Sequence, residues 1–197
     1  MKRLKDTVLV LLLLGIVVQG WVWIDHRSPG TDAAVQDAME PGDSLPMLKG
    51  HDRDRRPTSI QLTAGGQMNT VIYVYHPDCG PCGTVAPDWA RHFSDISARG
   101  PAVRMIALTR AGFPGASDFA DRFDWHIEIL SLTGVDMSPA ERHLISKTPW
   151  VFVFDSNGVL RLQAHGAELG RVEETLALLP HPTHPPNQPE QRVHNNP

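Results

Sequence analysis

The chain's two cysteines stand two residues apart, in the segment "HPDCGPCG" at 76–83. Cys79 and Cys82 are the only thiols in 197 residues, so within the chain each has only the other as a partner. Such a dithiol can form a disulfide, and its thiolate can attack the disulfide of another molecule. The spacing therefore predicts thiol-disulfide exchange.

Two other uses of this pair have to be considered. A closed zinc site needs four ligands, and without a second cysteine pair it would need His76 or His92 as substitutes. A purely structural disulfide would close so short a loop that it would restrict the unfolded chain little. Both alternatives stay open, and the exchange reaction is the favoured interpretation.

The elements around the cysteines assign a different role to each. "TVIYVY" at 70–75 is a short apolar run typical of a buried strand. The residues after the cysteines predict a helix, because apolar side chains recur on one helical face at Val85, Trp89, Phe93 and Ile96. The unpaired N–H groups and dipole of a helix N-terminus stabilise an anion. We therefore expect Cys79 to be the nucleophile and Cys82 to resolve the mixed disulfide.

The remaining pattern predicts an α/β fold, a mixed sheet flanked by helices. Strands are expected at 102–108 and 150–154, with an edge strand within 55–63. The segment "DSNG" at 155–158 indicates a hairpin, which makes the last two strands antiparallel. Helices are expected at 116–123 and 168–179; the second has Leu169, Val172, Leu176 and Leu179 on its inner face.

An uncharged apolar run at 7–24 predicts an N-terminal transmembrane helix, about 27 Å long at about 1.5 Å per residue. Basic residues precede the run, which favours a cytoplasmic N-terminus. A cleaved signal peptide is the alternative, but no small-x-small cleavage signal follows the run, and "QGWVWID" offers bulky residues instead. The expected parts are an anchor at 1–24, a polar tether at 25–44, a domain at 45–179 and a disordered Pro/His-rich tail at 180–197.

This arrangement predicts a single-pass protein of the cell inner membrane whose catalytic domain lies in the periplasm, if the cell is Gram-negative. A net charge of −4 and a pI near 6.2 give no basic footprint for nucleic acid. Histidines in a loose tract are more often solvated than bound to metal, and this applies to His181, His184 and His194. We expect no metal and no organic cofactor.

Several separated segments together resemble the thioredoxin superfamily, and in particular its membrane-anchored TlpA/ResA-like branch. "CGPCGTVAP" is similar to the thioredoxin motif and the Ala-Pro that follows it. "KTPWVFVFDSNGVL" resembles the segment with a cis-proline that faces the cysteines, and "HG" at 165–166 resembles the loop bordering the same groove. "DFADRFDWHIEIL" is similar to the extra helix and strand of the branch.

The resemblance implies a thioredoxin-like domain in which Cys79 and Cys82 are catalytic. It also implies that Gly80, Pro81, Thr148 and Pro149 contact the client protein, with the Thr148-Pro149 bond cis. The expected partners are thiol or disulfide client proteins and a membrane reductant donor of the DsbD/CcdA kind.

Three positions depart from the family pattern. Thioredoxins have a buried Asp where this chain has Tyr73, and the ResA-like glutamate is replaced by Val85. Without these carboxylates, no obvious residue carries a proton for Cys82. Asp78 replaces the usual Trp before Cys79, where its charge opposes formation of the thiolate. His76 remains a candidate proton carrier, although a loop histidine there is more often a surface residue.

Reduction of client disulfides is the predicted activity, and four other functions compete with it. The same motif could serve an oxidase or isomerase, and the same groove could bind a client without redox chemistry. A peroxidase would need a Pro and a Thr in a PxxxTxxC arrangement, which "YVYHPDC" does not supply.

Overall fold

The structure is a computed structural model that describes residues 38–63, 68–100 and 102–180. Its sheet has seven strands in the order β2-β1-β5-β4-β3-β6-β7. The strands are β1 (Met47–His51), β2 (Pro57–Gln61), β3 (Asn69–Tyr75), β4 (Val103–Thr109), β5 (Glu128–Ser131), β6 (Trp150–Phe154) and β7 (Leu160–His165). The helices are α3 (Gly80–Ala98), α4 (Gly115–Arg122), α5 (Pro139–Leu144) and α6 (Leu169–Leu178).

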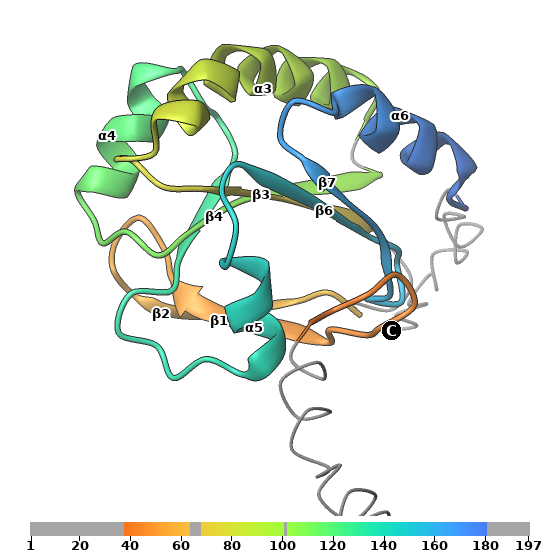
Figure 1. Cartoon of the computed structure of the whole chain (residues 1–197), viewed down its shortest axis with the longest axis horizontal. Coiled ribbons are helices and arrows are strands. Elements are labelled where there is room, and N and C mark those ends of the chain that lie inside the picture. Colours follow the sequence, from red (N-terminus) through yellow and green to blue (C-terminus); the bar gives the residue numbers. More distant parts are fainter. Residues whose placement is uncertain (1–37, 64–67, 101, 181–197) are drawn as a thin grey trace, which may run out of the picture. The chain divides into compact units, whose positions relative to one another are not determined.

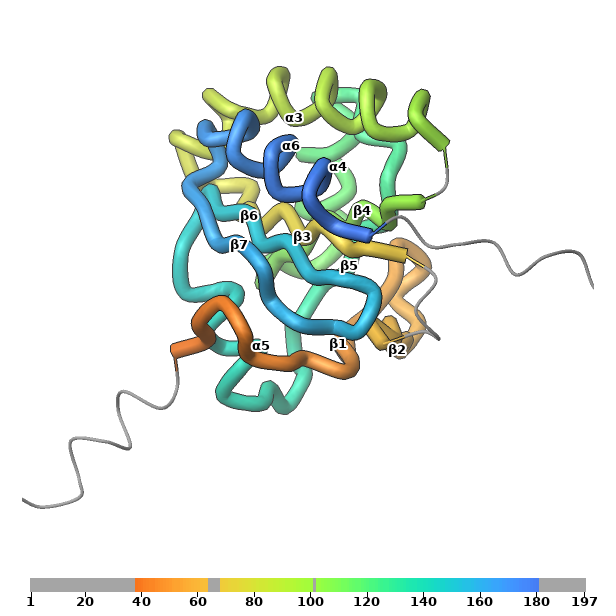
Figure 2. Tube along the Cα trace, turned by 90° about the vertical axis from the view of Figure 1, so that its right-hand side faces the viewer, coloured from red at the N-terminus to blue at the C-terminus, as the bar shows by residue number. Residues whose placement is uncertain are grey.

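Helices cover the sheet on two sides (Figure 1). α3, α4 and α6 lie on one face, and α5 lies on the other, which is also visible in the turned view (Figure 2). β3, β4 and β5 run parallel, whereas β6 and β7 form an antiparallel pair beside β3. β1 pairs antiparallel with both β5 and β2. The predicted mixed α/β sheet is confirmed.

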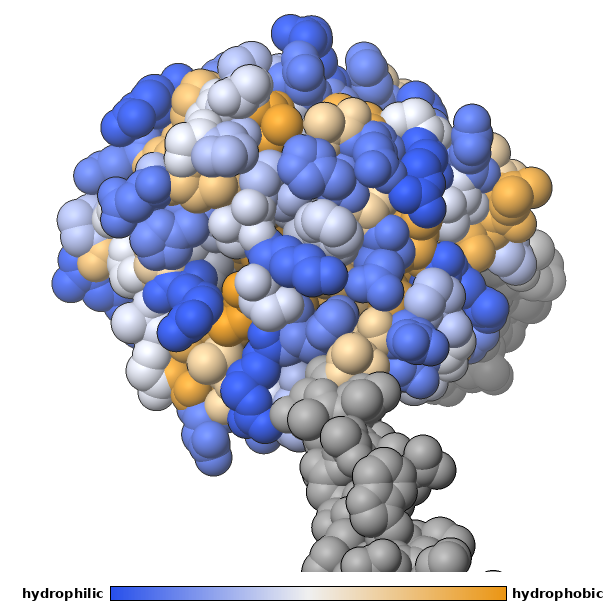
Figure 3. All heavy atoms as spheres, in the orientation of Figure 1, coloured by the Kyte–Doolittle hydropathy of each residue, from blue (hydrophilic) through white to orange (hydrophobic). Residues whose placement is uncertain are grey.

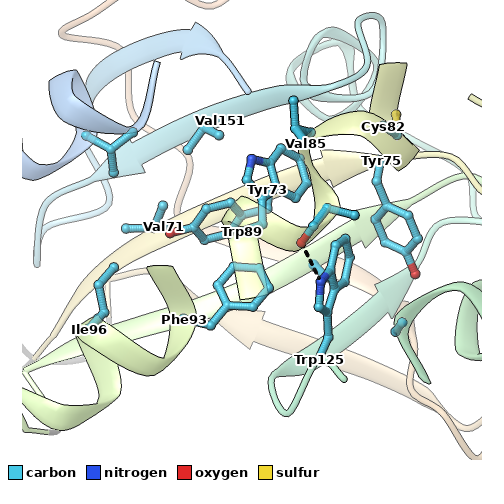
Figure 4. Close-up of a cluster of buried hydrophobic side chains, with 14 of the residues drawn as sticks. Val71, Tyr73, Tyr75, Cys82, Val85, Trp89, Phe93, Ile96, Trp125 and Val151 are labelled. Carbon is cyan, nitrogen blue, oxygen red and sulfur yellow. Dashed lines mark hydrogen bonds between the residues drawn. The ribbon is translucent and has the colours of Figure 1, made fainter. Parts of the chain in front are cut away.

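Each face of the sheet has its own hydrophobic core. Under α3, α4 and α6 the core is aromatic, and Figure 4 shows Tyr73, Trp89, Phe93 and Trp125 packed together. The Tyr73 and Phe93 rings are 4.7 Å apart between centroids and nearly perpendicular, a favourable edge-to-face geometry. The other core is mostly aliphatic, with Phe152 and Phe154 among its members, and lies between the sheet and α5; it is called the aliphatic core below. Figure 3 shows apolar side chains only in scattered spots on the outer surface of the drawn face.

The strands and helices that the hydrophobic pattern predicted are all present. The helix after the cysteines is α3, and its four predicted apolar residues are buried. The Asn-Gly hairpin joins β6 to β7, and Gly158 has the positive φ of 71° that such a turn requires. On α6, Val172 and Leu176 are buried, while Leu169 and Leu179 pack partly buried against the same core.

Two elements were not predicted, and both lack a readable hydrophobic pattern. β1 has the sequence "MLKGH", in which only Leu48 is a fully buried apolar residue. α5 has six residues, too few to show a helical period. It is recognisable instead from its N-cap, because Ser138 and Glu141 form a reciprocal capping box.

The domain begins before residue 45, within the stretch predicted as the end of the tether. Met39 is buried in the aliphatic core, and its carbonyl accepts a hydrogen bond from Gln163 Nε2. The backbone at 42–44 pairs with Val159 and Leu160. In the described ranges no helix is long and apolar enough to cross a membrane. The predicted span at 7–24 and the tail from 181 lie outside those ranges.

The buried His92 on α3 contacts Glu173 on α6. His92 is 5% exposed, and its Nδ1 lies 3.0 Å from Glu173 Oε1. Burial lowers the pKa of His92 from 6.5, although the nearby Glu173 carboxylate opposes this effect. The side chain is therefore neutral in the folded protein at pH 7.

This buried histidine predicts how stability depends on pH. Below its ordinary pKa of 6.5, the unfolded chain binds a proton at His92 that the folded chain does not, so the free energy of unfolding falls as pH falls. We expect His92→Gln to reduce this slope between roughly pH 7 and pH 5 in urea titrations. Equal slopes for the variant and the wild type would contradict the assignment.

Candidate functional site

The cysteines lie where β3 ends and α3 begins. Cys79 is the N-cap of α3 and Cys82 lies in its first turn, with their Cα atoms 5.2 Å apart and a disulfide between them. Cys79 is half-buried, whereas Cys82 is 1% exposed. Another molecule can therefore reach Cys79 more readily than Cys82.

Backbone groups hold the Cys79 sulfur at the helix terminus. The N–H of Cys82 donates to Cys79 Sγ at 3.2 Å, and Cys79 N donates to the His76 carbonyl at 3.0 Å. Gly80 and Pro81 are exposed between the cysteines, and Pro81 lies in the first turn, where its missing N–H costs no helical hydrogen bond. In the reduced protein the same Cys82 N–H is in position to stabilise a thiolate on Cys79.

The two polar residues just before Cys79 are exposed to different degrees. The Asp78 side chain is 92% exposed, so solvent screens the effect of its charge on Cys79. His76 is 39% exposed, and its Nδ1 accepts a hydrogen bond from Asp78 N. That bond places the proton of a neutral His76 on Nε2.

The Thr148-Pro149 bond is cis and lies at the same end of the domain as the cysteines. Thr148 and His76 line one small cavity, and His76 is hydrogen-bonded to Cys79. Thr148 is exposed, and within the described part of the chain no hydrogen bond uses its N–H or its carbonyl. These backbone groups are available to an extended segment of another protein.

Gly166 connects α3 to the segment that contains the cis Thr148-Pro149 bond, which is called the proline loop below. Its N–H donates to the Pro149 carbonyl at 3.1 Å, and its own carbonyl accepts from Trp89 Nε1 at 2.7 Å. A Cβ atom at Gly166 would lie 2.6 Å from Trp89 Cζ2 and 2.8 Å from Pro149 Cβ. Only glycine fits there, so α3, the loop before α6 and the proline loop hold one another in place.

Neither Tyr73 nor Val85 supplies a proton carrier for Cys82. Burial, with a smaller contribution from Glu173, raises the pKa of Tyr73 well above 10, so its hydroxyl stays protonated at neutral pH. Figure 4 shows that hydroxyl on the side of the ring away from Cys82. Val85 is buried and has no titratable group.

The metal-site interpretation receives no support from the positions of its candidate ligands. His92 is a buried residue in the C-terminal half of α3, where it contacts Glu173. Across 38–63, 68–100 and 102–180, no three His, Cys, Asp or Glu side chains gather in a group that could hold a metal ion.

Two features of the site could not be identified from the sequence pattern. The helical period identifies Trp89 as a core residue, but it does not indicate that its Nε1 donates a hydrogen bond to the Gly166 carbonyl. Arg110 follows β4 directly and lines the cavity beside Thr148, although β4 and Thr148 are far apart in sequence. A polar residue directly after a buried parallel strand is the one sequence signal that could have indicated it.

Among the comparisons with known proteins, the one with solved structures shows the fold. No protein-family model matches the sequence, and no curated protein gives a significant match. Among solved structures, the thioredoxin domain of a thiol-disulfide oxidoreductase from Bacteroides vulgatus is 13% identical, with a TM-score of 0.59 over 71% of this chain and 99% of that chain.

Two further structures extend the comparison. A secreted Mycobacterium tuberculosis disulfide oxidoreductase, homologous to DsbE of E. coli, is 18% identical with a TM-score of 0.50 over 64% of this chain and 95% of that one. The peroxidoxin BcpB of the same species is 13% identical with a TM-score of 0.53, over 71% and 95%. At these identities the likeness shows the fold alone, and this fold is thioredoxin-like.

Proposed function

We propose that this protein is a thiol-disulfide oxidoreductase that reduces disulfides of client proteins. The observation that carries the proposal is the Cys79–Cys82 disulfide at the N-terminus of α3, in which Cys79 is half-buried and Cys82 is buried. The proline loop beside it offers unpaired backbone groups to a client. Structures that share this fold include thiol-disulfide oxidoreductases.

The reaction proceeds by two exchanges. The Cys79 thiolate attacks a client disulfide, which forms a Cys79–client disulfide and releases one client thiolate. Cys82, after loss of its proton, then attacks Cys79 Sγ, forms the internal disulfide and releases the second client thiolate. Two electrons pass to the client, and solvent supplies the two protons that its thiolates take up. The loss of the Cys82 proton also falls to solvent, because Tyr73 and Val85 cannot accept it.

The environment of Cys79 favours a reducing couple. Cys82 N is the hydrogen-bond donor that the structure gives its sulfur, the exposed Asp78 charge weakly opposes a thiolate, and the side chains of Gly80 and Pro81 add no donor. A less stabilised thiolate corresponds to a more negative reduction potential.

We therefore expect the Cys79–Cys82 couple to have a potential below roughly −200 mV. Equilibration with glutathione buffers, followed by alkylation and mass analysis of the two cysteines, measures it. We expect Asp78→Asn to raise the potential only slightly, because the replaced charge is exposed. A potential near that of the oxidant DsbA, about −120 mV, would contradict a reductase and favour an oxidase or isomerase.

Membrane tethering is part of the proposal and is supported by the sequence. The apolar run at 7–24 with basic residues before it would hold the domain outside the cytoplasm, in the periplasm of a Gram-negative cell. An oxidising compartment would keep Cys79 and Cys82 oxidised unless a donor recharged them. A membrane reductant donor of the DsbD/CcdA kind would fill that role, and secreted thiol proteins would be the clients.

An insulin-reduction assay with dithiothreitol tests the proposed activity against a redox-silent binding module. The reductase is expected to accelerate insulin precipitation, whereas a binding module leaves it at the rate of dithiothreitol alone. The likeness to a peroxidoxin adds a peroxide-consumption assay to the same series. The segment before Cys79 does not have the PxxxTxxC arrangement of a peroxidatic site, so we expect no peroxide turnover above that of free dithiothreitol.

A further inference from the structure

A small cavity of 160 Å³ opens beside the cysteine loop. Its lining comes from three separate segments: Val74, Tyr75 and His76 at the end of β3, Arg110 just after β4, and Ile145 and Thr148 before β6. At about 30 Å³ per water molecule, the volume corresponds to roughly five waters. The cavity can therefore take one side chain and is too small for a folded segment.

The cavity lies between the two parts of the proposed client site. His76 borders it, and the His76 carbonyl accepts the hydrogen bond from Cys79 N. Thr148, whose backbone groups are unpaired, borders it as well. An extended client that places its cysteine at Cys79 and its backbone along Thr148 would bring a neighbouring side chain to this cavity.

The lining is cationic. Arg110 is exposed, and within the described residues its guanidinium forms no ion pair. None of the six lining residues has a carboxylate. The Nε2–H of His76 adds a donor, because Nδ1 is occupied by Asp78 N. Asp78 is the acidic residue beside His76, and its side chain is 92% exposed to solvent.

Hydroxyl groups of Thr109, Ser131 and Thr133 hold the backbone at Arg110 and Ala111. Thr109 and Ser131 are both nearly inaccessible, and they pair across β4 and β5. Thr109 Oγ1 accepts from Ala111 N, and Ser131 Oγ donates to the Ala111 carbonyl at 2.8 Å. Thr133 Oγ1 donates to the carbonyl of Arg110 itself. The backbone of the turn that carries Arg110 is thus fixed on both sides, which holds the base of the Arg110 side chain beside the cavity.

We propose that this cavity is a subsite for an acidic side chain of the client, an Asp or Glu close to the cysteine that Cys79 attacks, with Arg110 as its charged partner. The inference rests on the proposed function and adds a substrate class to it. A guanidinium binds a carboxylate through parallel N–H donors, and a lysine at the same client position would meet a like charge. The subsite selects clients by charge and takes no part in the exchange chemistry.

The test uses the reduced full-length chain and three disulfide peptides that are identical except for one residue beside the cysteine, which is Glu, Gln or Lys. The apparent kcat/KM is measured for each peptide at low salt. We expect the Glu peptide to exceed the Lys peptide by about fivefold, the upper end of what an exposed ion pair contributes. The ratio is expected to shrink as salt is added, because ions screen an exposed pair.

Variants of Arg110 show whether the preference comes from this residue. Arg110→Gln is expected to bring the Glu-to-Lys ratio close to one, and Arg110→Glu is expected to invert it. Arg122→Gln removes an exposed arginine on α4 that does not line the cavity, and it is expected to keep the wild-type ratio. The ratio compares peptides on the same protein sample, so a loss of folded protein leaves it unchanged.

The outcomes separate the subsite from the activity on which it rests. Equal rates for the three peptides, or an undiminished preference in Arg110→Gln, would overturn the subsite while leaving the reductase intact. A wild-type chain that reduces none of the peptides would overturn both. Loss of the preference in Arg110→Gln and its retention in Arg122→Gln would establish the subsite.

Discussion

Replacement of Cys79 by serine is expected to lower insulin reduction to the rate of dithiothreitol alone. Cys79 is the half-buried and more accessible of the two cysteines, and a serine side chain has no sulfur with which to form a mixed disulfide. Cys82→Ser is expected to lose turnover as well, but for a different reason. Its Cys79 can still attack a client, but the mixed disulfide then persists until dithiothreitol from solution resolves it, because the variant has no second thiol of its own.

The contrast between these two variants distinguishes the roles of the cysteines. After a single turnover without reductant, Cys82→Ser is expected to carry a covalently bound client and Cys79→Ser to carry none. A covalent client on the Cys79→Ser chain instead would show that Cys82 is the attacking thiol. That result would require the buried sulfur to become exposed during the reaction.

Replacement of Gly166 by alanine is expected to cost both stability and activity. The new Cβ would come within 3.0 Å of Trp89 and Pro149, which are both buried, so the loop must move. Overpacking of this kind costs about 1–3 kcal/mol in the free energy of unfolding. Movement of the loop also disturbs two hydrogen bonds, from Trp89 to Gly166 and from Gly166 to Pro149. These bonds position the proline loop, whose backbone groups at Thr148 are proposed to bind the client. We expect kcat/KM for peptide reduction to fall about tenfold or more.

Gly170→Ala is the matched control for this variant. Gly170 lies on α6, four residues further on, and a Cβ there meets no atom within 4 Å. Alanine in an exposed helical position stabilises a protein by about 0.5–1 kcal/mol relative to glycine, so this variant is expected to keep full activity. Urea titration and peptide kinetics on both proteins make the comparison. A Gly166→Ala protein as stable and active as Gly170→Ala would show that the contacts at Gly166 do not hold the site together.

The sequence predicts the parts of the fold that have a strong repeating pattern. β3, β4 and β6 are short strands made mainly of apolar residues, and α3 has apolar residues at regular helical steps. These elements also bring the cysteines to the helix N-terminus, so the centre of the site follows from the amino-acid pattern alone. β1 and α5 are different, because their positions depend on contacts with distant residues. The pairing of β1 with β5 and the bond from Lys49 N to the buried Glu141 are examples.

The surroundings of the cysteines are harder to predict, because they come from contacts between distant segments. The resemblance to thioredoxins identifies Thr148-Pro149 and the loop at 165–166, but not the indole that connects them through Gly166. In the same way, Arg110 reaches the site only because β3 and β4 are parallel and in register, with Tyr75 opposite Thr109. A single sequence contains no direct signal for such a pairing.

Mass analysis of a trapped intermediate tests the central claim most directly. The Cys82→Ser chain, fully reduced, is mixed with a disulfide-containing peptide and quenched with acid and an alkylating agent. We expect a mixed disulfide between the peptide and Cys79, identified by proteolysis and sequencing of the linked fragments. A chain recovered with Cys79 alkylated and no peptide attached, under conditions in which dithiothreitol reduces the same peptide, would contradict thiol-disulfide exchange at this site.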